Sequence, residues 1–129
     1  VIIKECAAYF PDNGVDKALY LGWLDKLQQA GIAVVIATVV PVTKADADRR
    51  PGRADGIAAF NDWLREIAKD RGLALLDLER ALRVSDEDRL LKAGLDNGDG
   101  LHLRPSTYRA YLDRLVVPAL MQAYENRQR

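Results

Sequence analysis

An aspartate and the chain's only histidine lie three residues apart and carry the clearest chemical potential in this sequence. In a turn, this spacing lets the carboxylate of Asp99 accept a hydrogen bond from Nδ1 of His102, which fixes the tautomer and leaves Nε2 free as a general base. The apolar neighbours Leu101 and Leu103 favour a loop that is held against the core. The pair would be two thirds of a Ser-His-Asp triad. The alternative is that Asp99 and Gly100 only form a turn and that His102 packs at the surface.

A nucleophile for this base is harder to find in the chain. Ser85 and Ser106 both lie where a helix is expected to begin, and we interpret them as structural residues. Cys6 follows an apolar segment, and a thiolate beside a histidine could attack an ester. Cysteine is nonetheless among the most buried residue types, so we interpret Cys6 as a core residue. One cysteine cannot form an internal disulfide, and the cellular compartment is left open.

The pattern of ligand-type residues predicts neither a metal nor a cofactor. Residues 96–100 are similar to a calcium loop but lack its order of acidic residues, and Thr107 stands where the final Glu of such a loop is required. One His and one Cys are too few for an ordinary zinc site. The glycine patterns of dinucleotide sites and P-loops do not occur in the sequence.

The composition argues against several classes of partner. The 129 residues are 49% hydrophobic and carry 19 basic against 19 acidic side chains, so we expect a single domain over residues 1–129. With a formal net charge of zero and no basic stripe, we expect no binding to nucleic acid. The longest apolar run is residues 30–42, whereas a membrane helix needs about 20 residues. We therefore expect a buried strand there and no membrane span.

The spacing of apolar residues predicts an α/β fold. Short β-branched segments without clean alternation are typical of strands covered on both faces, as in a parallel sheet. Between these segments, apolar residues recur with helical spacing. The alternation of strands and helices predicts right-handed βαβ units and a three-layer α/β/α architecture. The expected strands are residues 1–3, 32–40 and 73–78, and the expected helices are residues 15–30, 54–71 and 105–126.

Local signals refine the ends of these helices. Asp12 or Asn13 is a suitable cap for the first helix, and Pro118 is expected to kink or divide the last one. Residues 85–88 resemble an N-cap that opens a short helix up to Ala93. Aromatic residues at helical spacing are expected in the core: Tyr20, Trp23, Phe60, Trp63, Tyr108 and Tyr111.

Two polar segments are expected to be surface loops. Residues 43–53 contain Pro51 and follow an expected strand at its carboxyl end, where ligands of open α/β sheets bind. Three arginines in this segment could meet an anionic substrate, but we interpret them as solvated. The second loop is residues 94–100, which are rich in Gly and Asp. The three arginines are Arg49, Arg50 and Arg53.

The run of residues 99–105, with Tyr108 in the helix that follows, resembles the last sequence block of the SGNH (GDSL-type) hydrolases. The resemblance extends back to the expected strand that ends at residues 38–41. It implies that His102 is the general base and that Asp99 orients it. It also implies an α/β/α esterase or acyltransferase that needs no cofactor and acts on esters of lipids, small molecules or carbohydrates.

The resemblance covers only part of a family domain. In the family the nucleophile is a Ser in a Gly-Asp-Ser turn, and this chain contains neither that turn nor the second sequence block. We therefore expect the carboxyl-terminal portion of an SGNH-like domain, without its N-terminal strands and inactive by itself. At the third block the family has Gly-x-Asn, whose Asn donates to the oxyanion. This chain has Cys6, Ala7 and Ala8 there, and the nearest Asn is Asn13.

Two other interpretations remain open at this point. A non-catalytic SGNH-like domain, used for binding or scaffolding, is favoured by the missing Gly-x-Asn pattern. An unrelated flavodoxin-like or receiver-like domain would leave Asp99 and His102 pointing apart. Because the chain begins at Val1 without a Met, we also expect a preceding segment. That segment, or a second copy of the chain in a homodimer, could pair with the open edge of the strand at residues 1–3.

Overall fold

Three short parallel strands form the sheet in the part of the chain that the structure describes. The computed structural model describes residues 1–11 and 16–127. In the sheet, β1 (Ile2–Lys4) pairs with β2 (Val35–Ala37), which pairs with β3 (Ala74–Leu76). The predicted parallel sheet is confirmed. Its second and third strands are shorter than the apolar runs that predicted them, because burial extends beyond the residues that form the hydrogen-bonded ladder.

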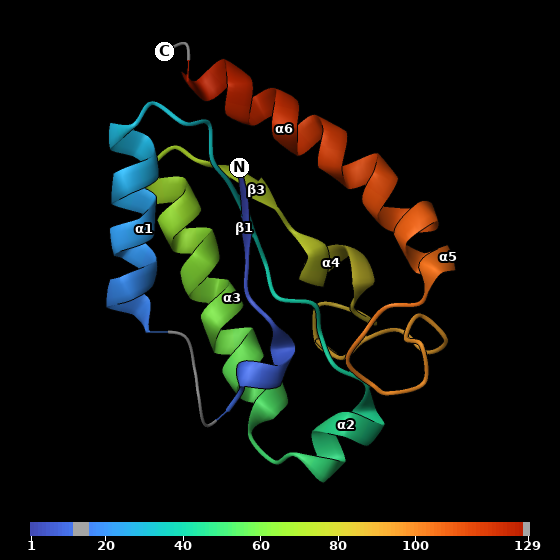
Figure 1. The fold of residues 1–129 in the computed structure, drawn as a ribbon. Helices are drawn as coiled ribbons and strands as arrows, with labels where there is room; N and C mark the ends of the chain where they lie inside the picture. Colours follow the sequence, from blue (N-terminus) through green and yellow to red (C-terminus); the bar gives the residue numbers. More distant parts are fainter. Residues whose placement is uncertain (12–15, 128–129) are drawn as a thin grey trace.

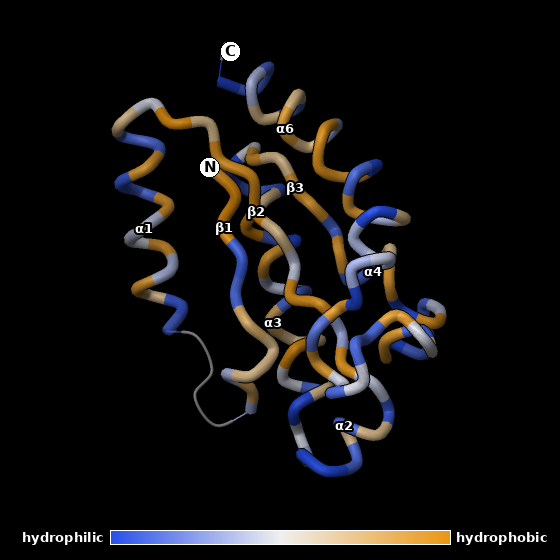
Figure 2. The backbone as a smooth tube through the Cα atoms, turned by 45° about the vertical axis from the view of Figure 1, so that its right-hand side comes forward, coloured by the Kyte–Doolittle hydropathy of each residue, from blue (hydrophilic) through white to orange (hydrophobic). Residues whose placement is uncertain are grey.

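Helices cover both faces of the sheet (Figure 1). Helices α1 (Lys17–Gln29) and α3 (Arg53–Asp70) pack on one face, whereas α4 (Leu78–Leu82) and α6 (Asp113–Arg127) pack on the other. The predicted three-layer α/β/α architecture is thus confirmed. Figure 2 shows apolar residues concentrated along the strands and alternating with polar ones along the helices. The first face of the core includes Tyr20, Leu24, Ile36, Phe60 and Leu64, and the second includes Val35, Ala37, Leu76, Leu82 and Ala119.

The start of α1 is set by an aspartate cap. The Asp16 side chain accepts hydrogen bonds from the backbone N–H groups of Ala18 and Leu19, at 2.9 and 3.2 Å. These contacts satisfy two of the donors that a helix leaves open at its first turn. Asp12 and Asn13, the caps expected from the sequence, lie outside the described residues.

The aromatic residues divide between core and surface. Tyr20 and Phe60 are buried as expected, but Trp23 and Tyr108 are 41% and 45% exposed. The Tyr20 ring meets Trp63 and Phe60 edge-on, at centroid distances of 5.6 and 6.1 Å. The Tyr20 hydroxyl is buried and has no hydrogen-bond partner in the described part of the chain. Burial raises the pKa of this phenol, because it disfavours the charged form.

The segment expected as a loop, residues 43–53, contains the short helix α2 (Lys44–Arg49). Thr43 is its N-cap, with Oγ1 accepting from the backbone N–H of Asp46 at 3.2 Å. Asp46 is buried and forms an ion pair at 3.0 Å with Arg53, which is also buried. The expectation of a solvated loop was therefore wrong, because a tertiary ion pair and a local cap stabilise the helix.

Residues 85–93 form no helix, contrary to the sequence prediction. The Ser85 hydroxyl does accept from the backbone N–H groups of Glu87 and Asp88, at 3.2 and 3.0 Å, as a cap would. The chain then folds back toward the sheet, since the backbone N–H of Leu91 donates to the carbonyl of Val42 at 2.9 Å. This long-range contact replaces the expected helix.

The last helical segment runs through Pro118. It consists of α5 (Pro105–Thr107), a π-helical turn, η2 (Tyr108–Leu112), and then α6. Pro118 was expected to kink or divide the helix; it lies inside α6 and does not divide it, and a kink at this residue stays a prediction. The irregular hydrogen bond comes earlier, where the backbone N–H of Asp113 donates to the carbonyl of Tyr108. In the described ranges, neither α6 nor any other helix is long and apolar enough to cross a membrane.

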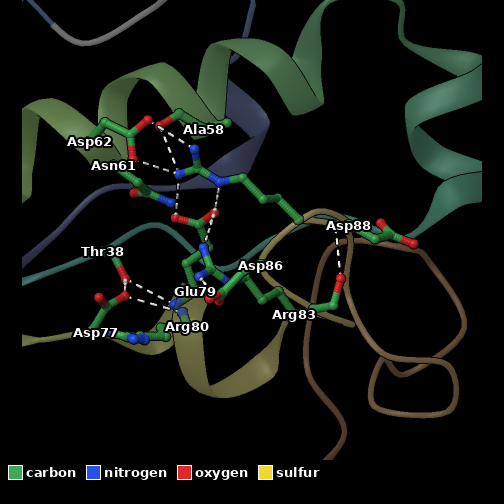
Figure 3. Close-up of polar contacts among 12 residues, drawn as sticks. Thr38, Ala58, Asn61, Asp62, Asp77, Glu79, Arg80, Arg83, Asp86 and Asp88 are labelled. Atoms are coloured by element: carbon green, nitrogen blue, oxygen red, sulfur yellow. Dashed lines mark hydrogen bonds and ion pairs between the residues drawn. The ribbon is translucent and has the colours of Figure 1, made fainter.

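A network of ion pairs joins α3 to α4 and to the loop that follows α4 (Figure 3). Its centre is Glu79, whose side chain is 1% exposed. Glu79 accepts hydrogen bonds from Arg65 at 2.8 Å and from Arg89 at 2.5 and 2.9 Å. Asp77 binds the same guanidinium of Arg65 at 2.8 Å, and Asp62 binds that of Arg89 at 2.8 Å. These ion pairs thereby link side chains of α3, α4 and the loop that follows α4.

The strand β1 is an edge strand of the sheet, because it pairs with β2 alone in the described part of the chain. An edge strand presents backbone N–H and C=O groups that a further strand can bind. The expectation that a preceding segment or a second copy of the chain pairs there stays a prediction.

Candidate active site

The loop of residues 94–104 lies at the carboxyl end of the sheet. The carbonyl of Gly100 accepts a hydrogen bond at 3.1 Å from the backbone N–H of Thr43, which follows β2. His102 lines a pocket together with Cys6, which follows β1. Ligands of open α/β sheets bind at this edge, so the loop occupies a position suited to an active site.

Asp99 and His102 contact each other as the spacing predicted. The Oδ2 atom of Asp99 lies 2.6 Å from Nδ1 of His102, and Oδ1 accepts from the backbone N–H groups of Leu101 and His102, both at 2.8 Å. Because an ionised carboxylate can only accept, Nδ1 carries the proton and Nε2 is left as the basic nitrogen. The imidazole is 63% exposed, so it is accessible to a reactant.

A second aspartate shapes the turn that precedes this pair. The Asp96 carboxylate accepts from the backbone N–H groups of Gly98 and Gly100, at 3.0 and 3.1 Å. The loop closes where the backbone N–H of Asn97 donates to the carbonyl of His102 at 2.8 Å. Side chains that bind nearby backbone groups in this way stabilise turns. The Gly- and Asp-rich loop is thus present as predicted.

The pKa of Asp99 lies below its ordinary value of 3.8, because the backbone N–H and then the ring of His102 donate to it. In an NMR titration, the carboxyl carbon of Asp99 should have a midpoint below pH 3.8. The stability contributed by this ionised group is present above pH 3.8 and is lost as the pH falls through the lower folded-state pKa. In His102→Ala the midpoint should rise, because the ring no longer donates. An Asp99 that titrates at its ordinary value in the unmodified chain would contradict this geometry.

His102 borders a pocket of about 330 Å³. The pocket is lined by residues of the three strands, η1 (Ala7–Tyr9), α4, the 94–104 loop and the last helical segment. Its walls are mainly apolar and carry a few polar groups, which is typical of small-molecule sites. The other lining residues are Ile2, Lys4, Cys6, Ala7, Ala37, Val40, Leu76, Leu78, Leu101, Leu103, Tyr108, Leu112 and Val116.

No hydroxyl or thiol of the described residues forms a hydrogen bond with the His102 ring. Cys6 was expected in the core, but it is half-buried at the pocket wall, and no hydrogen bond joins its thiol to the imidazole. The Ser85 hydroxyl donates to Glu87 at 3.0 Å, and Ser106 is exposed in α5. Ser85 therefore has the structural role that the sequence indicated, whereas no contact in the structure shows such a role for Ser106.

The expected position of the oxyanion-binding Asn holds alanines. Ala7 and Ala8 lie in a short 3₁₀ helix, η1 (Ala7–Tyr9), directly after β1. Asn13 lies outside the described residues. Asn61 is buried and has a structural role. Its side-chain amide accepts a hydrogen bond from the backbone N–H of Val39 at 2.7 Å and donates one to the backbone carbonyl of Val39 at 2.9 Å.

The arginines near the loop differ in their surroundings. Arg50 is exposed, whereas Arg49 donates to the carbonyl of Asp99 at 3.4 Å. Nothing in the sequence spacing linked Arg49 to Asp99, because the contact depends on how α2 lies against the loop. Within residues 1–11 and 16–127, no three His, Cys, Asp or Glu side chains are grouped to hold a metal ion.

Comparison with known proteins identifies the family. The model of the GDSL-like lipase/acylhydrolase family matches residues 7–110. A GDSL-like lipase from Bacteroides thetaiotaomicron has a similar structure, with a TM-score of 0.68 and 15% identity over 82% of this chain and 51% of that one. A candidate acylhydrolase from Bacteroides fragilis gives a TM-score of 0.67 and 16% identity over 81% and 50%.

The chain thus spans about half the length of both solved structures. No curated protein matches the sequence. The unrelated receiver-like alternative was wrong, because it required Asp99 and His102 to point apart. With the family model covering most of its length, the chain belongs to the GDSL-like lipase/acylhydrolase (SGNH) family.

Proposed function

We propose that Asp99 and His102 are the orienting acid and the general base of a Ser-His-Asp esterase or acyltransferase. The observation that carries this proposal is the 2.6 Å contact between Asp99 Oδ2 and His102 Nδ1, in a loop that borders a pocket. In this arrangement the imidazole can offer Nε2 to a hydroxyl group. Residues 1–129 would form part of one family domain, with the serine supplied by residues outside this chain.

The reaction would proceed through an acyl-serine. Nε2 of His102 takes the proton of the serine hydroxyl while the serine oxygen attacks the ester carbonyl, and Asp99 stabilises the imidazolium that forms. The ester C–O bond then breaks, and His102 returns the proton to the leaving alcohol. Water, activated by the same base, cleaves the acyl-serine. In an acyltransferase a second alcohol takes the place of water, and neither route requires a cofactor.

The walls of the pocket support an ester with an apolar group as the substrate. The pocket of about 330 Å³ can hold a small acyl or alcohol moiety next to His102. Esters of small molecules, lipids or carbohydrates all contain such a moiety. The chain by itself should not turn them over, because no hydroxyl or thiol of its described residues forms a hydrogen bond with the imidazole.

A serine-directed fluorophosphonate probe tests the proposal on the full-length protein. We expect covalent labelling of one serine, because the base activates its hydroxyl. The variant His102→Ala should lose the labelling, whereas Arg71→Lys, a change at an ion pair between α1 and the end of α3, should retain it. Labelling that survives in His102→Ala would exclude His102 as the base.

A non-catalytic binding or scaffold domain is the second candidate, and one observation favours it. Ala7 and Ala8 offer no side-chain donor for an oxyanion. In proteases the loss of one such donor costs about 3 kcal/mol of transition-state stabilisation. A folded full-length protein that resists the probe would support this candidate, and labelling would exclude it.

A further inference from the structure

Two loops that are distant in the sequence meet around His102. One follows β1 and contributes Cys6 to the pocket, and the other is the 94–104 loop. Their relative position decides how the imidazole faces a reactant. Leu101 of the 94–104 loop packs against the core cluster that contains Ala7 and Phe10, and polar contacts add direction to this apolar packing. The contacts that connect the two loops pass through α2, which lies beside the 94–104 loop in Figure 1.

The first part of this path is a buried arginine. Arg53 is 7% exposed, and its Nε donates to the carbonyl of Phe10 at 2.8 Å, directly after η1. Its Nη1 donates to both carboxylate oxygens of Asp46, at 3.2 and 3.0 Å. Asp46 is 4% exposed. The rigid guanidinium fork therefore holds a backbone carbonyl and a buried carboxylate in one geometry.

The second part of the path runs from Asp46 to the His102 loop. Gly100 has φ +83°, and a Cβ on it would lie 2.9 Å from Cβ of Asp46 and 2.8 Å from Oγ1 of Thr43. The backbone of the loop thus rests directly on these two residues, with no space for a side chain. The hydrogen bond from Thr43 to the Gly100 carbonyl, at 3.1 Å, fixes the same contact.

We propose that Arg53 is a positioning residue: through Asp46 it sets the distance between the loop that carries His102 and the loop that carries Cys6. The expected effect of Arg53 on turnover rests on the proposed function, whereas its effect on the distance between the two loops does not. Arg53 touches neither the imidazole nor Asp99 through any hydrogen bond in the described residues. It acts on them only through the placement of the loop.

The chain offers a direct measurement, because it contains one Cys and one His. A nitroxide attached to Cys6 enhances the relaxation of the His102 ring protons with the inverse sixth power of their distance. Arg53→Lys keeps the charge, but a lysine cannot bind Phe10 and Asp46 with one planar fork. We expect the two loops to move apart by about 1 Å, which at a spin-to-proton distance of roughly 10 Å would lower the relaxation enhancement by about twofold and reduce turnover by the full-length protein about 100-fold.

Matched variants separate positioning from stability. Arg71→Lys alters a remote ion pair with Asp25 and should leave the relaxation unchanged. Asp46→Asn weakens the ion pair between Asp46 and Arg53 and should lower the relaxation enhancement of the His102 ring protons, as Arg53→Lys does. If Arg53→Lys fails to fold, the result with Asp46→Asn tests the proposal. A purely structural Arg53 would lower the free energy of unfolding without changing the relaxation in the folded state. Unchanged relaxation in the folded variants would overturn the proposal, whatever the result with the serine probe.

Discussion

Replacing Asp99 by asparagine in the full-length protein should lower kcat by about 10⁴-fold, the loss seen when the orienting carboxylate of a serine protease becomes an amide. The carboxylate now accepts from Nδ1 of His102 at 2.6 Å. An asparagine amide can donate to Nδ1 instead, which moves the ring proton to Nε2 and removes the base. Hydrolysis of an activated ester such as p-nitrophenyl acetate measures the loss.

Two controls make this result specific. Asp25→Asn changes an exposed carboxylate that pairs with Arg71, and it should leave kcat unaltered. The nitrogen chemical shifts of the chain's one imidazole report the tautomer directly at pH 9, where a free imidazole is neutral. We expect Nδ1–H in the unmodified chain and Nε2–H in Asp99→Asn. Full activity in Asp99→Asn would remove Asp99 from the mechanism.

Replacing Glu79 by alanine should lower the free energy of unfolding by about 3 kcal/mol, near the lower end of the cost of breaking a buried ion pair. Glu79 is 1% exposed and accepts from Arg65 and Arg89. Both arginines would lose a buried partner. They are partly exposed and keep Asp77 and Asp62, which limits the cost.

Urea unfolding of the chain measures this effect. Glu66→Ala is a suitable control, because Glu66 is an exposed residue of the same α3 helix that carries Arg65. Exposed substitutions of this kind usually change stability by less than about 0.5 kcal/mol. A Glu79→Ala variant as stable as this control would show that the network contributes little to folding.

The strands and α3 could be predicted from the sequence because their signal is local. Apolar residues recur along α3 with helical spacing, and Ile57, Phe60, Leu64 and Ala68 are buried as that spacing requires. The contact between Asp99 and His102 was also predictable, since it depends on a turn of four residues. In these cases the period of the apolar residues, or the spacing of two polar residues, is enough to predict which side chains are buried or in contact.

The misses share a physical cause, which is dependence on contacts between distant residues. Helix α2 requires Asp46 to be buried against Arg53, seven residues later, and residue types alone suggested a solvated segment. Ser85 forms a cap-like turn, yet the bond between Leu91 and Val42 draws the chain away from a helix. The network around Glu79 likewise depends on packing that no local pattern encodes.

The carboxylate of Asp99 accepts three hydrogen bonds from residues of the same four-residue turn. One carboxylate oxygen caps the backbone while the other aligns the ring, so ordering the peptide and aiming the nitrogen are a single event. The tetrapeptide of residues 99–102 therefore carries its own orienting contacts. If this tetrapeptide is inserted into another protein that binds the backbone of Gly100 as Thr43 and Asp46 do here, its imidazole should be oriented in the same way.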